Sequence, residues 1–420
     1  MKKQHSMSDR VVITGVGMIT SVGNDRESSW LAVRSGQSGV RRMTGLIGIP
    51  DEKLLGATVE GLAVEAGETR YAPLAMQAAE EALRDSELEL RTVDHQRFAC
   101  GITANVGDTP RIARKRTESL PSGSYDPWWT RFLPNSTCAH IARRFALHGP
   151  RFCHSAACAS GTVATLRAYR AIQDDQCDLA LVGSAQMIHP LLAAGFHNMR
   201  VLAQHDDPAQ ACRPFDINRS GFVMGEGAAM LVLERLSHAQ QRRAPIYAEI
   251  VGGQILCEAH HVTGLDSSSQ PLYQLIDATL RKSGLGPSDI SYINAHGTGT
   301  KQNDAMETRG IRAALGQAAN SVCVSSTKSM LGHLLNAAGS VELAITTMAL
   351  RDGFAPPTLN LTDPDPDCDL DCIPLVGRSQ KFEHAMKLSI AFGGHLAAVA
   401  LRRWSGAGER HEHHPLQRAA

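Results

Sequence analysis

Apolar and polar positions along the chain follow two alternating patterns, which predict strands that alternate with helices. Short apolar runs of four to eight residues are typical of buried strands, and apolar positions spaced three or four apart are typical of amphipathic helices. The strand pattern covers residues 11–15, 98–104, 152–156, 178–183, 247–251 and 322–325, and a further strand ends at residues 293–294. The helix pattern covers residues 28–34, 73–84, 159–173, 272–283, 304–315 and 337–350, with Asn303 as a cap and Gly316 as a stop for the fifth of these. This alternation predicts an α/β fold.

The two halves of the chain end alike. Residues 222–235 have the pattern of a strand, a glycine turn and an alanine-rich strand, and residues 390–403 align with them without a gap. With the shared order of strands and helices, this indicates an internal duplication. We therefore predict two similar α/β halves, residues 11–246 and 247–404, packed around one core. Three segments are expected to be irregular: the tails 1–9 and 405–420 and an insertion at 107–134 that contains Trp128 and Trp129.

Composition narrows the class of protein. The 420 residues carry 42 basic and 42 acidic side chains, so the net charge is zero and a nucleic-acid partner is disfavoured. Ten cysteines without paired spacing favour reduced thiols over a disulfide framework. The chain has no secretory signal pattern and no apolar run of the ~20 residues that a membrane span requires. These features predict a cytoplasmic protein.

Cys158 is the strongest candidate for chemistry. It lies between an apolar strand pattern and a helix pattern, where the free N–H groups of a helix start stabilise negative charge. Such a position lowers the pKa of a thiol and favours the nucleophilic thiolate. Small residues on both sides leave room for a substrate, although close packing of a helix on a strand would require them too. From the spacing alone, a nucleophile and a buried structural cysteine remain equally open.

Two histidines lie in glycine-rich turns far along the chain. His296 follows a strand and begins the run His-Gly-Thr-Gly-Thr, in which the hydroxyls of Thr298 and Thr300 are suited to an amide-bearing substrate arm. Histidines at strand ends in such loops are more often functional than buried core residues. His333 closes a second loop of this kind that begins near Lys328. A fold that brings Cys158 together with both histidines would build an active site.

These motifs together resemble the β-ketoacyl-acyl carrier protein synthases of the elongating type. The motifs occur in order at residues 157–161 (Ala-Cys-Ala-Ser-Gly), 213–222 and 225–227 (Arg-Pro-Phe-Asp-Ile-Asn-Arg-Ser-Gly-Phe and Gly-Glu-Gly), 294–300 with 303–304 (Asn-Ala-His-Gly-Thr-Gly-Thr and Asn-Asp), 328–333 (Lys-Ser-Met-Leu-Gly-His) and 392–394 (Phe-Gly-Gly). The resemblance covers residues 11–403. It implies a thiolase-like fold, in which a duplicated α/β unit forms a five-layered αβαβα core, and a homodimer.

The resemblance also implies a reaction and its residues. Cys158 would accept an acyl group from a phosphopantetheine thioester, and malonyl-acyl carrier protein would then lose carbon dioxide and attack the acyl-cysteine. His296 and His333 would stabilise the enolate. The implied supporting residues are Lys328, beside His333 with Glu307 as its ionic partner and Asp304 in support; Phe392, a gate whose N–H joins that of Cys158 as an oxyanion donor; Thr298 and Thr300, along the pantetheine tunnel; and Asn294, Glu342 and Ser389, around a monovalent cation. No resident cofactor is expected, because the 4'-phosphopantetheine arrives on the carrier protein.

Several positions depart from the family pattern. Ala391 takes the place of a glycine before the gate phenylalanine, where it should restrict the backbone. His395 and Leu396 replace small polar residues, Asn336 replaces a glycine, and His154 is unfamiliar. These changes bear on chain length and partner choice, and they remove no atom that the chemistry requires.

Partners and rival functions complete the predictions. The clearest basic cluster is a solvated helix face or a docking patch for an acidic carrier protein; its members are Arg111, Arg114, Lys115 and Arg116, with Arg143, Arg144 and Arg213 as weaker candidates. A thiolase would carry a second cysteine in the segment 392–394, and an initiating synthase would replace one histidine by asparagine. The remaining alternative is a non-catalytic subunit of a heterodimeric synthase, but such subunits lose the nucleophile that Cys158 provides.

Overall fold

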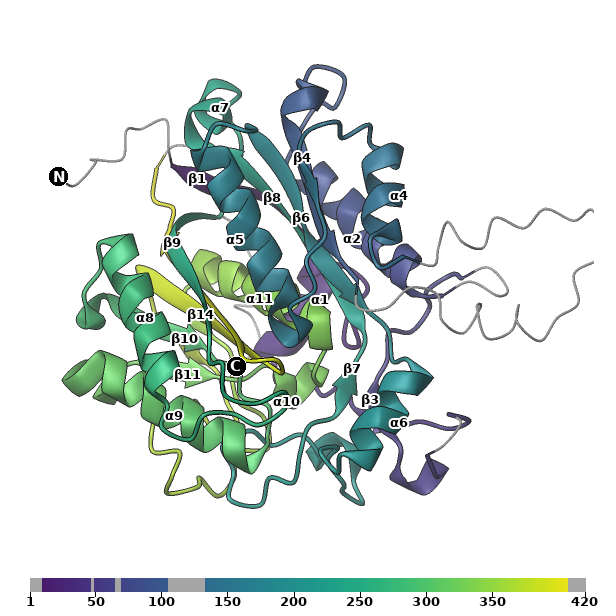
Figure 1. Ribbon diagram of the computed structural model, residues 1–420, viewed down its shortest axis with the longest axis vertical. Coiled ribbons are helices and arrows are strands. Elements are labelled where there is room, and N and C mark those ends of the chain that lie inside the picture. The colour runs from purple at the N-terminus through teal and green to yellow at the C-terminus, as the bar shows by residue number, and fades with distance from the viewer. Residues whose placement is uncertain (1–9, 47–48, 65–68, 105–132, 407–420) are drawn as a thin grey trace, which may run out of the picture.

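The main sheet has ten strands in the order β11-β10-β14-β15-β9-β1-β8-β6-β4-β5 (Figure 1). The structure is a computed structural model that describes residues 10–46, 49–64, 69–104 and 133–406. The first half holds β1 (Val11–Thr20), α1 (Arg26–Arg34), β2 (Arg41–Arg42), η2 (Asp51–Lys53), β3 (Leu55–Ala57), α2 (Tyr71–Asp85), η3 (His95–Arg97), β4 (Phe98–Thr103), α4 (Ser136–Arg144), β5 (Arg151–Phe152), η5 (Ala157–Ala159), α5 (Ser160–Gln173), β6 (Leu179–Gln186), α6 (Pro190–Asn198), η6 (Pro208–Gln210), β7 (Met224–Gly225), β8 (Gly227–Arg235) and α7 (Leu236–Gln241). The second half holds β9 (Ala248–Cys257), α8 (Gln270–Ser283), η7 (Pro287–Asp289), β10 (Ile290–Asn294), α9 (Lys301–Leu315), η8 (Gly316–Asn320), β11 (Cys323–Ser325), α10 (Lys328–Leu331), η9 (Leu335–Ala337), α11 (Ala338–Asp352), β12 (Phe354–Ala355), β13 (Arg378–Ser379), β14 (His384–Ala391) and β15 (His395–Arg403).

The strand order shows the duplication directly. The first half contributes β1-β8-β6-β4-β5 and the second contributes β9-β15-β14-β10-β11, so each set places its first, fifth, fourth, second and third strands in that order. Antiparallel pairing of β1 with β9, from Val11 with Ile250 to Ile13 with Ala248, joins the two sets into one sheet. The predicted α/β class and its internal duplication are confirmed.

The helices form three layers around these two sets of strands (Figure 1). α5 and α11 lie side by side between them, and every residue of α11 from Ala338 to Arg351 is buried. A helix that is buried on all sides needs mostly apolar or small residues around its circumference, which α11 has, and its two buried charged residues, Glu342 and Arg351, are paired in salt bridges. α2 and α4 cover the outer face of the first set, and α8 covers that of the second with α9 packed beside it. The predicted five layers are therefore present.

The two central helices approach each other closely at their first turns. A Cβ on Gly161 would lie 2.3 Å from Ser340 Oγ, and one on Gly339 would lie 2.4 Å from Thr162 Oγ1. Just before each helix, one residue has a positive φ, 44° at Ala157 and 46° at Leu335. The position that follows is Cys158 in the first half and Asn336 in the second, so the turn that presents the cysteine is itself duplicated.

Three predicted details are wrong. The strand expected at 152–156 ends at Phe152, because the chain must turn before η5 to present Cys158. Residues 222–225 do not form a hairpin with β8, since β7 pairs with β3 in a separate three-stranded sheet, whereas β14 and β15 do form one. Thr300, not Asn303, is the N-terminal cap of α9. Residues 133 and 134 of the expected insertion and 405 and 406 of the expected tail are described as irregular chain; the rest of both segments and tail 1–9 lie outside the described residues.

Over the described ranges, no helix combines the length and the apolar character that crossing a bilayer requires.

Candidate active site

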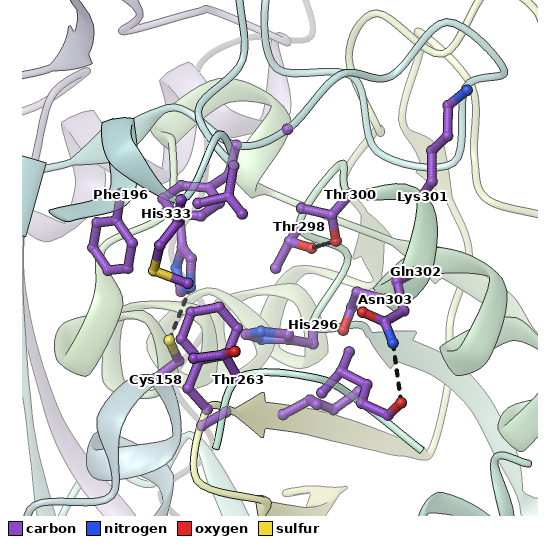
Figure 2. Close-up of a pocket in the computed structure, with 18 of the residues that line it drawn as sticks. Cys158, Phe196, Thr263, His296, Thr298, Thr300, Lys301, Gln302, Asn303 and His333 are labelled. Carbon is purple, nitrogen blue, oxygen red and sulfur yellow. Dashed lines mark hydrogen bonds between the residues drawn. The ribbon is translucent and has the colours of Figure 1, made fainter. Parts of the chain in front are cut away.

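One cavity of about 510 Å³ brings together Cys158, His296, His333 and Phe392 (Figure 2). These residues come from the start of α5, the loop after β10, the loop after α10 and the β14–β15 turn. Apolar side chains of Phe196, Met199, Val201, Phe222 and Leu335 line other parts of its wall. The fold thus joins three side chains that the sequence analysis singled out separately.

Cys158 lies in η5, directly before α5. The Oγ of Ser160 accepts the N–H of Ala156 at 2.9 Å and donates to the carbonyl of Ala157 at 2.7 Å, which fixes the turn. Burial raises the pKa of the Cys158 thiol to about 12, and the positive charge of Lys328 opposes this only in part. The expected lowering of this pKa is therefore wrong: the loss of water around a thiolate at this partly buried position outweighs the helix start.

His333 contacts the cysteine directly. Its Nε2 lies 3.1 Å from Cys158 Sγ (Figure 2), and its Nδ1 accepts the N–H of Leu335 at 3.2 Å. A neutral imidazole whose Nδ1 accepts must carry its proton on Nε2. His333 therefore presents an N–H donor to the sulfur and the cavity.

His296 completes the group. Its ring centroid lies 5.3 Å from that of His333, at an interplanar angle of 82°. Burial is the largest cause that holds the pKa of both histidines well below 6.5, and the charge of Lys328 acts in the same direction. Both rings are neutral near pH 7, as hydrogen-bond donors to a developing anion should be.

Two carboxylates hold the backbone of the His296 loop. Glu307 accepts the N–H of His296 at 2.6 Å and that of Gly297 at 2.7 Å. Asp304 accepts the N–H of Gly299 at 3.2 Å and that of Phe215 at 2.9 Å. Asp304 and Glu307 thus fix the loop that carries His296 and the two threonines.

Lys328 has a different partner from the one expected. Its Nζ donates to the carbonyl of His296 at 2.5 Å and to Glu342 Oε1 at 2.5 Å. The expected ion pair with Glu307 is wrong, because Glu307 is engaged with the backbone of the loop. Lys328 positions His296 through its carbonyl, and it acts on His333 only as a nearby charge.

A known protein family matches most of the chain. The family described as beta-ketoacyl synthase matches this chain with its N-terminal domain over residues 8–239 and its C-terminal domain over residues 247–362. The chain belongs to the β-ketoacyl synthase family.

Several relatives match over nearly their full length. The chain is 36% identical to a 3-oxoacyl-(acyl-carrier-protein) synthase 2 of Coxiella burnetii, over 94% of this chain and 98% of that protein. It is 37% identical to the tetracenomycin polyketide synthase ketoacyl synthase alpha subunit of Streptomyces glaucescens, over 94% and 97%. Among solved structures, the type II polyketide ketosynthase AntDE in complex with its acyl-carrier protein AntF matches with a TM-score of 0.87 at 30% identity, over 94% and 99%.

The monovalent cation that the resemblance implies does not fit this synthase. Glu342 already contacts two ammonium groups, Lys328 and, through Oε2 at 2.7 Å, Lys387. Ser389 Oγ is paired with Thr162 Oγ1 at 2.8 Å, and a further cation would face two positive charges against one carboxylate. Within the described ranges, no cluster of three or more His, Cys, Asp or Glu residues is arranged to hold a metal ion. Lys387 was not predicted, although a lysine inside an apolar strand pattern is a signal that could have indicated it.

The backbone before the gate residue Phe392 is less restricted than the replacement of a glycine by Ala391 suggests. Ala391 lies inside β14 without a positive φ, and the left-handed positions are Gly393 (φ 83°) and Gly394 (φ 76°). The N–H of Gly393 donates to the carbonyl of Val262 at 2.7 Å, which ties the turn to the loop after β9. The expected restriction at Ala391 is therefore wrong, since the backbone there is ordinary strand.

The other departures have structural explanations. Leu396 is fully buried in the core of the second half, and His395 begins β15 opposite Ala391. The Nδ2 of Asn336 donates to the carbonyl of Ala185 at 3.1 Å, which ties η9 to β6. His154 packs on the ring of Phe152, with centroids 5.6 Å apart.

The remaining predicted residues line the cavity, lie on other parts of the fold, or fall outside the described residues. Thr298 and Thr300 line the cavity, with their hydroxyl oxygens 2.9 Å apart (Figure 2). The expected basic cluster, Arg111, Arg114, Lys115 and Arg116, lies outside the described residues. Arg143 and Arg144 lie on α4, away from the cavity, and Arg213 lies 3.8 Å from Asp216. Two exposed basic residues, Arg200 and Lys301, do line the cavity. The sequence did not indicate them, because each is an isolated basic position.

Proposed function

We propose that this synthase joins an acyl group held on Cys158 to malonyl-acyl carrier protein, with loss of carbon dioxide, to give a β-ketoacyl-acyl carrier protein. The observation that carries the proposal is the shared cavity, in which His333 Nε2 lies 3.1 Å from Cys158 Sγ and the His296 ring lies beside His333. Relatives named as 3-oxoacyl-acyl-carrier-protein synthase support the substrate class.

The first step transfers the acyl group to the cysteine. Cys158 Sγ attacks the thioester carbonyl, the bond to the pantetheine sulfur breaks, and the proton of Cys158 leaves with that sulfur. The Nε2–H of His333 stabilises negative charge on Cys158 during the attack. The backbone N–H groups of Cys158 and Phe392 serve as the oxyanion donors for the carbonyl oxygen.

The second step makes the carbon–carbon bond. The malonyl thioester loses carbon dioxide, and the electron pair passes into an enolate whose oxygen accepts from His296 and His333. The enolate carbon attacks the acyl carbonyl and releases Cys158, which takes up a proton. Because both histidines are neutral donors in a buried site, they stabilise the enolate without first having to lose a proton. Lys328 holds His296 in place.

The reaction requires no resident cofactor, because the 4'-phosphopantetheine arrives on the carrier protein. Its arm enters past Thr298 and Thr300, whose hydroxyls are suited to its amides. Arg200 and Lys301 give the mouth positive charge for an acidic carrier protein. The complex of AntDE with the acyl-carrier protein AntF supports this partner.

The working unit is a dimer in the cytoplasm. β5 is the outermost strand of the described sheet and pairs with β4 on one side, so its other edge is available to a second copy. The solved ishigamide ketosynthase/chain length factor supports the alternative of a heterodimer. Light scattering after size exclusion distinguishes a homodimer from a monomer that needs another subunit.

The test is reconstitution with defined carrier proteins. The protein is mixed with acyl-carrier proteins of several chain lengths and malonyl-carrier protein, and mass spectrometry follows the carrier proteins. A β-ketoacyl product that disappears in Cys158→Ala supports the function. Absence of product with every acyl length, both alone and with a candidate partner subunit, contradicts it.

A further inference from the structure

Lys387 is a buried cation beneath the His296 turn. Its side chain has no exposed surface, although it lies in the middle of β14 among apolar neighbours. Its Nζ contacts three oxygens: Glu342 Oε2 at 2.7 Å, the carbonyl of Ala295 at 3.3 Å and the carbonyl of Leu388 at closer range. One carboxylate and two backbone carbonyls are the oxygen ligands that a small monovalent cation would use.

The charges around Lys387 are uneven. Lys328 and Lys387 share the single carboxylate of Glu342, so this buried triad carries one excess positive charge when both lysines are protonated. The charge of Lys387 also acts on Glu307, but the oxygens of Glu307 accept the N–H groups of His296 and Gly297. A buried charge is costly unless it is paired, so an apolar residue in this strand would be cheaper for stability alone.

The contacts of the two lysines lie on consecutive residues of the catalytic loop. Lys387 holds the carbonyl of Ala295, Lys328 holds the carbonyl of His296, and Glu307 holds the N–H of His296. The backbone on both sides of the His296 ring is thereby fixed.

We propose that the Lys387 ammonium is a tethered cation that takes the place of a dissociable monovalent ion beneath His296. It is a positioning residue, which acts on the enolate-stabilising ring through Glu342 and the Ala295 carbonyl. The effect on catalysis rests on the proposed function, whereas the effect on ion dependence does not.

Ion dependence of stability and rate tests the proposal. Melting temperature and malonyl decarboxylation are measured at equal ionic strength in potassium, sodium and choline chloride for the wild type, Lys387→Ala and Lys387→Met. The wild type is expected to behave alike in all three salts. Lys387→Ala leaves space at the oxygens, so its decarboxylation should fall by about tenfold or more in choline and recover in sodium or potassium, with a parallel rise in melting temperature. Lys387→Met fills that space and should be slow in every salt.

Two results would overturn the proposal. One is a specific requirement of the wild type for sodium or potassium over choline, in stability or in rate. The other is a Lys387→Ala variant that decarboxylates as fast as the wild type in choline.

Lys381→Ala, at an exposed lysine before the same strand, is the control for loss of one charge. If Lys387→Ala does not fold, the wild-type comparison still decides, because it needs no variant. If the wild type forms no product, the proposed function fails. The ion dependence of the melting temperatures then still tests whether Lys387 takes the place of a bound cation.

Discussion

His333 Nε2 lies 3.1 Å from Cys158 Sγ, although 175 residues separate them along the chain. Because the Nδ1 of His333 accepts the N–H of Leu335, the proton of this ring faces the sulfur. From this relationship we infer that His333 serves as a donor that stabilises negative charge, first on sulfur and then on the enolate, and not as the base that removes the cysteine proton.

Removal of either histidine should affect decarboxylation most. We expect His296→Ala and His333→Ala each to slow the loss of carbon dioxide from malonyl-carrier protein by about 10²–10³-fold, the typical cost of one lost donor to a developing oxyanion. Radioactive carbon dioxide release measures this directly. His154→Ala is the control, since His154 lies near the cysteine in sequence but does not line the cavity. A normal rate in both cavity variants would refute the assignment.

The raised pKa of Cys158 predicts its response to alkylation. Because burial raises the pKa of this thiol to about 12, the thiolate is scarce at pH 7 and its fraction grows tenfold per pH unit below the pKa. The rate of modification by iodoacetamide should therefore rise about tenfold per unit from pH 7 to pH 10. Peptide mapping separates Cys158 from the exposed Cys257. A rate for Cys158 that levels off below pH 8 would show a stabilised thiolate instead.

The crossing of the two central helices should tolerate no added atom. In Gly161→Ala, the new methyl group would lie 2.3 Å from Ser340 Oγ and 2.6 Å from its backbone nitrogen. Overpacking of this kind costs about 1–3 kcal/mol of unfolding free energy. Gly195→Ala is the matched control, because a Cβ at Gly195 in α6 meets no atom within 4 Å. Denaturant titration compares the two, and equal stabilities would contradict the packing described.

Neutralising the shared carboxylate should destabilise the protein. Glu342→Gln leaves Lys328 and Lys387 buried without their counter-charge, and breaking a buried ion pair in this way costs about 3–5 kcal/mol. Burial lowers the pKa of Lys387 to about 8, so much of that charge is lost by pH 9. The destabilisation should thus be larger at pH 7 than at pH 9. Denaturant titration at both values checks this, and a loss below about 1 kcal/mol at pH 7 would contradict it.

The sequence predicted what local pattern and motif encode. Apolar periodicity located both central helices closely, with 159–173 expected against Ser160–Gln173 observed and 337–350 against Ala338–Asp352. The motif order also placed the cysteine and both histidines in the correct loops. These features depend on residues adjacent in the chain.

The sequence did not predict which charged side chains form pairs or how burial shifts the pKa values of side chains. Glu307 was expected to pair with Lys328, but the fold directs it to the backbone N–H groups of His296 and Gly297. The pKa of Cys158 was predicted from its helix start, but the direction of its shift is set by burial among segments that are distant in the sequence. Lys387 was missed because its partners come from α11 and from the end of β10, which only the fold brings to β14.

The most direct test of the three-residue site is the location and fate of the acyl group. The protein is incubated with an acyl-carrier protein, digested and mapped by mass spectrometry, before and after addition of malonyl-carrier protein. The acyl mass should appear on the Cys158 peptide alone, and it should be lost upon this addition as the β-ketoacyl product forms. An acyl group on another cysteine, or one on Cys158 that malonyl-carrier protein does not discharge, would refute the three-residue site.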